Sequence, residues 1–492
     1  MAIKTLSRRS FFKGFAGIAA FGAGGCLLMR RGEKVRLAVV GIWGKGYEDM
    51  TWFLKHGKCE IVALCDCDRN MLPRVQTQLK TDGLVLDISR IPFYTDYRRM
   101  LDDADSLGIE AMQISTPDHM HAAMAINAMK KGIHVYVQKP LVRTLWELDR
   151  FEATAKDCGV ITQMGNQGSS GASFRRGVEI LQSGILGEVS EVHVWTNRPV
   201  WPQGDWARDL LARPDDPVPA GLDWDAWIGT SKMRPYKGER GADKRDYPWC
   251  VKVGNTKVYH QFNWRGFADF GTGALGDMAS HLMNLPYRGL KLGAMVWANC
   301  RVATETHPGI YPAASIVEIG FASRPELKFT WYEGGFLPDP DITAPIRSIF
   351  KEVPVGGCIV VGSKGALYST DNYGQSSFVM MKGEAKVRSI LKHEACKAVV
   401  QTLPRRPEAH VAGNYGEFID AIIGKTPYID DVHSRCYGDV EHSIPLMEGM
   451  LAACAAQCVP GTRIGWDAKS RRFDHDVANA MIMPHIRSGW EF

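Results

Sequence analysis

An acid and an imidazole stand four residues apart in the glycine-rich segment 271–281, as Asp277 and His281. If this segment opens a helix, both side chains lie on one helix face. A carboxylate beside an imidazole suits general-base chemistry, because the carboxylate orients the ring and stabilises its charged form. Such a pair could take the proton of a substrate hydroxyl. The alternative is structural, with a capping Asp and a packed His.

Two other segments carry polar residues directly after predicted buried strands. One contains Thr116, Pro117 and His121, and the other is Gln138–Lys139–Pro140. Open α/β sheets bind ligands at the carboxyl ends of their parallel strands. A lysine at such a strand end, with its backbone restrained by the following proline, could orient a substrate hydroxyl. Taken alone, Lys139 could equally be an ordinary surface lysine.

A glycine-rich turn, Gly41–Ile–Trp43–Gly44–Lys–Gly46, follows the predicted strand 35–40. A dinucleotide-binding turn uses glycines to bend tightly, to admit a pyrophosphate and to pack the next helix, whose N-terminus favours phosphate. Trp43 occupies the second glycine position, and Gly44 beside it could compensate. Asp66 ends the next strand, 25 residues after Gly41, where an acid accepts hydrogen bonds from the adenine ribose. The pattern predicts NAD, and NADP stays open because the preference rests on Asp66 alone.

The elements that must position these residues alternate between strand and helix in the first half of the chain. This alternation is typical of a parallel α/β sheet, so we expect a Rossmann domain over residues 34–160. Asp118 is the expected N-cap of one helix. The expected strands are 35–40, 60–65, 109–115, 133–137 and 160–164, and the expected helices are 47–56, 71–80, 118–131 and 144–158.

The second half changes character, so residues 161–492 are expected to form a substrate-binding α/β domain with a mixed or antiparallel open-faced sheet. Half of the fourteen tryptophans lie between Trp195 and Trp264, and indole faces suit the C–H faces of sugars. Core packing is an equally open alternative for each residue. The candidate substrate contacts are Asn166, Gln167, Arg198, Asn263, Trp264 and Arg265. Further strands are expected at 191–196, 315–321, 327–331 and 358–361, and helices at 415–423 and 443–457.

The N-terminus has the composition of a targeting segment. Residues 1–25 contain the pair Arg8–Arg9, two following aromatics and an apolar Gly/Ala-rich stretch, and they resemble a twin-arginine export signal. We therefore expect the twin-arginine export machinery as a partner and a periplasmic location, with a lipid anchor at Cys26 as the alternative to cleavage.

Charge and cysteine content exclude two other classes of site. Lys4, Arg8, Arg9 and Lys13 account for four of the five net positive charges, so the rest of the chain is near neutral and no nucleic-acid partner is expected. The cysteines lack the paired spacing of zinc ligands, and no metal site is predicted. A homo-oligomer stays open.

Taken in order, these motifs resemble the glucose–fructose oxidoreductase/inositol dehydrogenase (Gfo/Idh/MocA) family over residues 34 to roughly 290. The motifs are the glycine turn, Asp66, Thr116–Pro117, Lys139–Pro140 and Asp277–x3–His281. The stretches 195–204, 263–266 and the ending 487–490 resemble its exported branch.

The resemblance implies an NAD(P)-dependent oxidoreductase that acts on a sugar or glycoside hydroxyl. It implies that Lys139 contacts the reacting hydroxyl and the cofactor, that His281 is the general acid/base, and that Asp277 binds the sugar. Export implies a tightly bound, recycled cofactor. The cofactor contacts are expected at Gly41, Trp43, Gly44, Gly46, Asp66, Thr116, Pro117, His121, Gln138 and Lys139.

Two departures from the family pattern leave an alternative open. Gln138 stands where the family usually has Glu, and Trp43 replaces a glycine. The alternative is a non-catalytic exported carbohydrate-binding relative. A separate alternative follows from the retained cofactor: a redox-neutral NAD-dependent glycosidase, which oxidises, eliminates, adds water and reduces again. The sequence does not identify the sugar or the hydroxyl.

Overall fold

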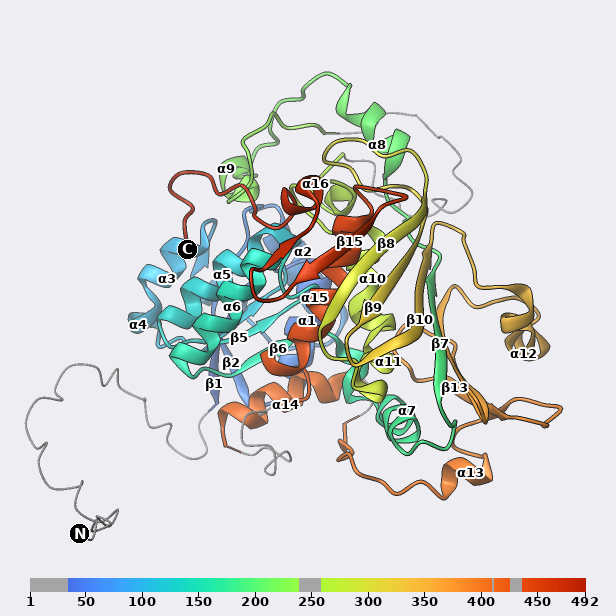
Figure 1. Ribbon diagram of the computed structural model, residues 1–492. Coiled ribbons are helices and arrows are strands. Elements are labelled where there is room, and N and C mark those ends of the chain that lie inside the picture. The colour runs from blue at the N-terminus through green and yellow to red at the C-terminus, as the bar shows by residue number, and fades with distance from the viewer. Residues whose placement is uncertain (1–33, 239–257, 409–410, 425–435) are drawn as a thin grey trace, which may run out of the picture. The chain divides into compact units, whose positions relative to one another are not determined.

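Figure 1 shows the computed structural model, which describes residues 34–238, 258–408, 411–424 and 436–492. The predicted signal segment 1–25 and the lipid-anchor alternative at Cys26 lie outside the described residues. Among the described helices, none has the length and apolar character needed to span a membrane.

The first six strands of the chain form one parallel sheet. They are β1 (Val35–Val40), β2 (Cys59–Cys65), β3 (Phe93–Tyr94), β4 (Ala111–Ile114), β5 (His134–Val137) and β6 (Thr162–Met164). Their spatial order is β3-β2-β1-β4-β5-β6, so the direction of strand addition reverses between β1 and β4. Ligands of doubly wound sheets bind at this reversal. The predicted α/β class with an N-terminal Rossmann sheet is confirmed.

The four predicted helices of this half are present, and two short helices that were not predicted follow β3. Thr144 caps α6 through a capping box with Glu147, in which each side chain bonds the other residue's backbone N–H. The last strand, β6, lies a few residues past the domain boundary expected at 160. The helices are α1 (Lys45–His56), α2 (Met71–Thr81), α3 (Tyr97–Asp102), α4 (Ala104–Leu107), α5 (His121–Lys130) and α6 (Leu145–Cys158), with 3₁₀ turns η1 (Ile88–Arg90) and η2 (Asp118–Met120).

The prediction that Asp118 caps a helix is wrong. Asp118 begins the 3₁₀ turn η2, and α5 starts at His121 without a side-chain cap. The Asp118 carboxylate instead accepts a hydrogen bond from the Thr272 hydroxyl at 2.8 Å. A tertiary partner far along the chain has taken the place of the local backbone bond.

The remaining strands form a ten-stranded sheet in the order β14-β13-β12-β11-β7-β10-β9-β8-β15-β16. The β7–β10 pair is parallel and the other pairs are antiparallel, which confirms the predicted mixed sheet. The strands are β7 (Val189–Thr196), β8 (Met295–Ala303), β9 (Ser315–Phe321), β10 (Arg324–Glu333), β11 (Gly356–Gly362), β12 (Gly365–Ser369), β13 (Ser377–Met381), β14 (Arg388–Ser389), β15 (Arg463–Asp467) and β16 (Arg472–Phe473).

Helices and 3₁₀ turns connect these strands. They are η3 (Gln167–Ser170), α7 (Ala172–Gln182), α8 (Gly204–Leu211), α9 (Trp224–Ile228), η4 (Asn263–Gly266), α10 (Gly273–Leu282), α11 (Asn284–Leu290), α12 (Pro340–Phe350), α13 (Glu394–Lys397), α14 (Ala412–Ile422), α15 (Val440–Ala456) and α16 (Asp476–Asn479).

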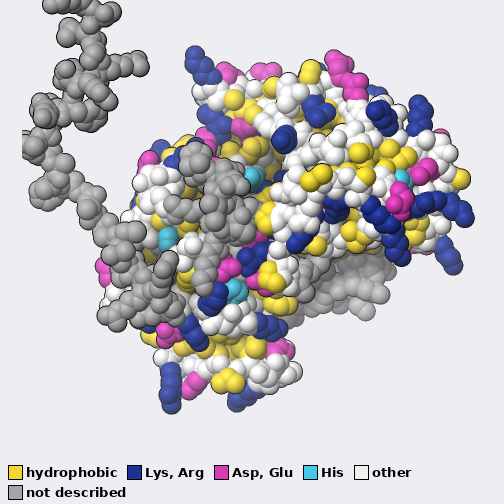
Figure 2. All heavy atoms as spheres, turned by 90° about the horizontal axis from the view of Figure 1, so that it is seen from below, with side chains coloured by type: hydrophobic (Ala, Val, Ile, Leu, Met, Phe, Trp, Pro, Cys, Tyr) yellow, Lys and Arg dark blue, Asp and Glu magenta, His cyan; other side chains and the backbone are white. Residues whose placement is uncertain are grey.

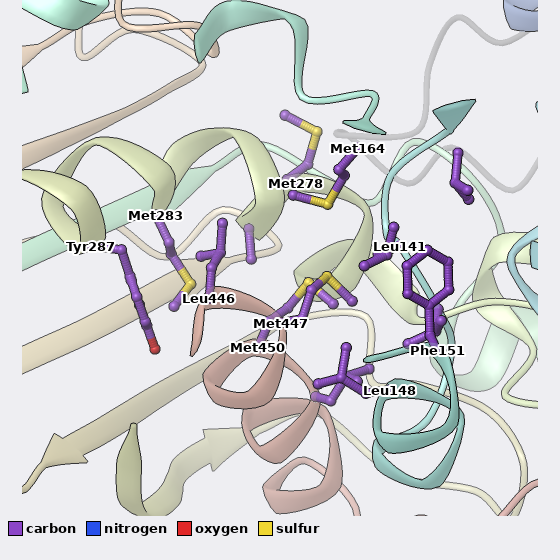
Figure 3. Packing of buried hydrophobic residues seen from close by; sticks show 14 of the residues in the cluster. Leu141, Leu148, Phe151, Met164, Met278, Met283, Tyr287, Leu446, Met447 and Met450 are labelled. Atoms are coloured by element: carbon purple, nitrogen blue, oxygen red, sulfur yellow. The ribbon is translucent and has the colours of Figure 1, made fainter. Parts of the chain in front are cut away.

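Helix α15 joins the two sheets through one apolar core. Figure 3 shows Met447 and Met450 of α15 between Leu148 and Phe151 of α6 on one side and Met278 of α10 on the other. Each fully buried side chain of this size contributes about 1.5–3 kcal/mol to folding. The shared core therefore holds α10 in place against the N-terminal domain.

On the face shown in Figure 2, acidic and basic side chains are mixed.

Candidate active site

A cavity of about 590 Å³ lies at the carboxyl ends of the parallel strands. Its wall includes Gly41 after β1, Asp66 after β2, Thr116 after β4 and Lys139 after β5, and α10 contributes Asp277. Ligand pockets of proteins commonly measure about 300–1,000 Å³. The strand ends of the first sheet and the second domain thus form one binding space.

The glycine turn at one end of this cavity cannot accept side chains at two positions. Gly41 has φ of 79°, and a Cβ there would lie 2.4 Å from the carbonyl oxygen of Ser115. A Cβ on Gly46 would lie 1.7 Å from the carbonyl oxygen of Gly41. Gly46 is buried and packs α1 onto the turn, whereas Gly41 and Gly44 line the cavity.

The neighbourhood of Gly44 fits a phosphate-bearing ligand. Gly44 is the N-cap residue of α1, and a Cβ on it would meet no other atom within 4 Å, so the start of the helix borders open space. Half-buried Trp43 also lines the cavity and packs against Tyr47, with ring centroids 6.0 Å apart. Its side chain therefore forms part of the wall and leaves the start of α1 accessible.

Asp66 is held at the cavity wall by backbone groups. Its carboxylate accepts hydrogen bonds from the N–H groups of Ile42 (3.0 Å) and Asp68 (2.9 Å). Burial raises the pKa of Asp66 to about 6, so it is largely ionised at neutral pH. A carboxylate here suits a ribose hydroxyl and would repel a 2′-phosphate.

Gln138 is paired with a second buried carboxylate, Asp49. The Gln138 amide donates to Asp49 Oδ2 at 2.8 Å, and Asp49 Oδ1 accepts from the Tyr415 hydroxyl at 2.6 Å. Lys45 lies 3.3 Å from the same carboxylate. A glutamate at position 138 would supply a negative charge. In this protein Asp49 of α1, the hydrogen-bond partner of Gln138, supplies that charge instead.

Lys139, Asp277 and Arg265 form a charge cluster at the other end of the cavity. Lys139 Nζ donates to Asp277 Oδ1 (2.8 Å) and to the Asp277 carbonyl (2.7 Å), and Arg265 Nε donates to Oδ1 (3.1 Å). Burial opposes ionisation of Asp277, but the two cations outweigh it and hold its pKa below the ordinary value. Asp277 therefore stays charged and fixes Lys139.

His281 lies on the same face of α10 as Asp277, as predicted, but the two do not form a pair. No hydrogen bond joins them among the described residues, and His281 Nδ1 is buried without a partner. The ring instead packs edge-to-face against Tyr373, with centroids 5.0 Å apart. Burial and the nearby Lys139 charge lower the pKa of His281 well below its ordinary value, so the imidazole is neutral and able to accept a proton.

Two predicted contact residues lie behind the cavity wall. The nitrogens of His121 lie 2.7 Å from the Pro140 carbonyl and 2.9 Å from the Thr116 carbonyl, so this buried ring bridges the two strand-end turns. Burial lowers the pKa of His121 to about 4. Asn166 is buried and accepts a bond from the Ser169 hydroxyl at 3.3 Å. Both residues position the wall rather than line it.

The predicted substrate residues Gln167, Arg198, Trp264 and Arg265 line the cavity, as do Thr116 and Pro117. Asn263 does not line it and is buried in η4. Gln167 donates to the Tyr415 hydroxyl at 3.3 Å, and the Arg265 guanidinium lies 4.3 Å from the Trp264 ring centroid.

Among the described tryptophans of the segment 195–264, one group packs in a separate apolar cluster, and another faces the cavity. The cavity-lining members are Trp201, Trp227 and Trp264, and those in the cluster alone include Trp206 and Trp224.

The sequence did not identify Asp118, Tyr373 or Trp490 as site residues, yet all three line the cavity. Burial raises the pKa of Asp118 to about 7. Its place directly after the strand-end Thr116–Pro117 pair was an available signal. Trp490 lies in the ending 487–490, which carried the family resemblance but was given no site role, and Tyr373 comes from a segment without a local motif.

Comparison with known proteins agrees with this geometry. Residues 35–166 match the family model GFO_IDH_MocA, an oxidoreductase family with an NAD-binding Rossmann fold. The chain is 28% identical over 167 residues to a protein of Shewanella pealeana named glycosyl hydrolase family 109 protein, which covers 33% of this chain and 35% of that protein. An alpha-N-acetylgalactosaminidase of Shewanella oneidensis is 26% identical over the same shares. The chain thus spans about a third of the length of the curated relatives it matches.

Among solved structures, the fold is similar to an inositol dehydrogenase homolog from Azotobacter vinelandii complexed with NADH and myo-inositol. The TM-score is 0.57 at 16% identity, over 88% of this chain and 98% of that chain. This likeness extends the shared fold from the matched domain into the second sheet.

Proposed function

We propose that the protein is an NAD-dependent oxidoreductase acting on a sugar or glycoside hydroxyl, because residues 35–166 match the Gfo/Idh/MocA oxidoreductase family model with its NAD-binding Rossmann fold. The observation that carries the proposal is that Lys139 and the glycine turn border one cavity, with Lys139 fixed by Asp277. When bound, NAD supplies the hydride acceptor for the carbon that bears the hydroxyl.

Lys139 has the geometry to hold the reacting oxygen. An ammonium carries three N–H donors, and two of them go to Asp277. The third is left for a ligand in the cavity. A fixed cation at this point stabilises the negative charge that develops on the oxygen as its proton leaves.

His281 is the proposed acceptor of that proton. Its imidazole is neutral because burial and Lys139 depress its pKa, and it lines the same cavity. Asp277 acts through Lys139: it balances the lysine charge and restricts the side chain to one position. General-base efficiency needs both the neutral ring and the correct placement of the hydroxyl.

A carbohydrate substrate fits the remaining wall. Trp201, Trp227 and Trp264 supply aromatic surface, and Arg198 and Arg265 supply hydrogen-bond donors. Indole stacks on the apolar faces of sugar rings, while guanidinium groups bind their hydroxyls or carboxylates. We also propose that residues 1–25 direct export and that the cofactor stays bound, with NADH reoxidised by transfer of its hydride to a second sugar.

The test is a single-turnover experiment on protein as purified. A panel of sugars is added, and reduction of the bound nucleotide is followed by NADH absorbance. We expect reduction with at least one sugar, and its loss in Lys139→Met. Absence of reduction with every sugar, in protein that carries NAD, would remove the dehydrogenase assignment.

The second candidate is an NAD-dependent glycosidase, favoured by the names of the curated relatives. Its net reaction is hydrolysis: the ring hydroxyl is oxidised, the aglycone is eliminated, water adds, and the ring is reduced again. Product analysis separates the two. In a single turnover, a keto-sugar with the bound nucleotide left as NADH indicates the dehydrogenase. A free monosaccharide with the nucleotide returned to NAD indicates the glycosidase. Sugar binding without any nucleotide would instead identify a non-catalytic relative.

A further inference from the structure

The C-terminal tail, residues 487–492, returns to the end of the cavity that contains the glycine turn 41–46 and Asp66, which we call the nucleotide end. In Figure 1 the red chain runs past α9 and ends beside α3. Trp490 is only 4% exposed, and it forms part of the cavity wall. Two sets of contacts hold the indole in this position, one through Arg487 and one through Arg98.

The first anchor attaches the tail to α9 through Arg487. Its backbone N–H donates to the Thr230 carbonyl at 2.9 Å, and its Nε donates to the Gly229 carbonyl at 3.0 Å. Its Nη1 pairs with the Asp225 carboxylate. Arg487 does not line the cavity, so its bonds fix the tail from outside.

The second anchor attaches the indole to α3 through Arg98. The Arg98 guanidinium lies 3.6 Å from the Trp490 ring centroid and donates to the Gly489 carbonyl at 2.5 Å. The same guanidinium donates to Asp96, from Nε to both carboxylate oxygens at 3.0 Å and from Nη2 to Oδ2 at 2.6 Å. The indole is therefore fixed between the tail backbone and a charged pair.

The place of Trp490 identifies the ligand group that it would meet. Asp96 and Tyr97 follow β3, whose residue Tyr94 pairs with Cys65, the residue before Asp66. Trp490 contacts Tyr97, with ring centroids 6.4 Å apart. The indole thus belongs to the same end of the cavity as the carboxylate suited to a ribose. An aromatic wall beside such a carboxylate suits an adenosine group, since every base has a π-face.

We propose that the tail clamps the adenosine half of NAD, with Trp490 as one wall of that subsite. This inference rests on the proposed NAD-dependent function and explains how an exported enzyme would keep its cofactor. Dissociation of the nucleotide then depends on anchors that lie outside the cavity, on Arg98 and Arg487.

The test measures how fast NADH dissociates from full-length protein, by stopped-flow displacement with excess NAD. Base–aromatic contacts of this kind change affinity by roughly tenfold to a hundredfold. We expect that increase in dissociation rate for Trp490→Ala, a smaller one for Trp490→Phe, and a clear one for Arg487→Ala. The matched control is Trp297→Ala, which removes an indole packed on Arg463 at 3.9 Å outside the cavity wall and should leave the rate unchanged.

The outcomes separate the two proposals. If wild type binds NADH and both Arg487→Ala and Trp490→Phe keep the wild-type rate, the clamp is wrong and the proposed function stands. If wild type binds no nucleotide, both fail. Trp490 also belongs to the apolar core, so the NADH dissociation rate of Trp490→Ala is compared with wild type only if the variant still unfolds cooperatively. If it does not, the rate of Arg487→Ala decides whether the tail retains the nucleotide.

Discussion

The two ends of the cavity are built on opposite principles. At the nucleotide end, Gly41 and Gly46 act through the side chains they lack, and Asp66 is held by backbone N–H groups. At the other end, Lys139 and Asp277 act through their charges, which come from segments 138 residues apart. The first end requires a particular backbone path, and the second requires charge balance. We therefore expect substitutions at the first end to abolish nucleotide binding and substitutions at the second end to reduce stability and turnover.

The largest effect is expected for Gly46→Ala at the nucleotide end. Its Cβ would lie 1.7 Å from the Gly41 carbonyl oxygen, and backbone cannot move aside as a side chain can. We expect NAD binding to be abolished, as measured by calorimetry. Gly57→Ala is the control: it lies at the other end of α1 with φ of 80° and open space around it. It should cost about 1–2 kcal/mol and leave binding intact. Binding by Gly46→Ala would contradict the proposed role of the turn.

Asp277→Asn tests the charge-balanced end. The change leaves Lys139 and Arg265 without their shared anion, so we expect a loss of about 3–5 kcal/mol in the free energy of unfolding. Turnover should disappear while NAD stays bound, because the glycine turn and Asp66 are unaltered. The exposed pair Arg99–Asp102 provides the control, and Asp102→Asn should cost at most about 1 kcal/mol. Loss of NAD from folded Asp277→Asn would show that the two ends are not separable.

The pH dependence of stability should also differ between the ends. The pKa of Asp118 rises from 3.8 to about 7 on folding, and that of Asp66 from 3.8 to about 6. Between the two pKa values of each group, the folded protein keeps a proton that the unfolded chain releases. The contribution of each carboxyl group to the free energy of unfolding is therefore fully present below about pH 4 and is lost as the pH rises to the folded-state pKa. The loss is roughly 1.4 kcal/mol per pH unit over that window.

Denaturant unfolding of two variants as a function of pH checks this prediction. The stability of Asp118→Asn relative to wild type should increase up to about pH 7, and that of Asp66→Asn only up to about pH 6. A flat difference for Asp118→Asn would mean that its carboxylate is hydrated.

The smallest effect is expected for Gln138→Glu, between the two ends. It places a second carboxyl group at hydrogen-bond distance from Asp49, so one of the two must take up a proton. We expect a cost of about 1–2 kcal/mol at neutral pH. The double variant Gln138→Glu with Asp49→Asn should recover most of it. Failure of that rescue would contradict the assignment of the missing charge to Asp49.

The sequence predicted what depends on neighbours in the chain. The apolar run Val35–Val40 is β1, and the glycine turn and Asp66 lie where strand-and-turn spacing indicated. It failed where a distant partner decides. Thr272 draws Asp118 away from the helix cap, and Lys139 and Arg265 engage Asp277 in place of His281. Trp490 lies against Arg98, nearly 400 residues earlier in the chain, and no local pattern encodes that contact.

The most direct test of the account is the nucleotide content of protein purified without added cofactor. The protein is denatured and the released small molecules are identified by mass spectrometry. The account predicts close to one NAD or NADH per chain, because the cavity binds the dinucleotide and the tail retains it. No nucleotide, together with no uptake when NAD or NADP is offered, would contradict it and leave a sugar-binding protein without a redox function.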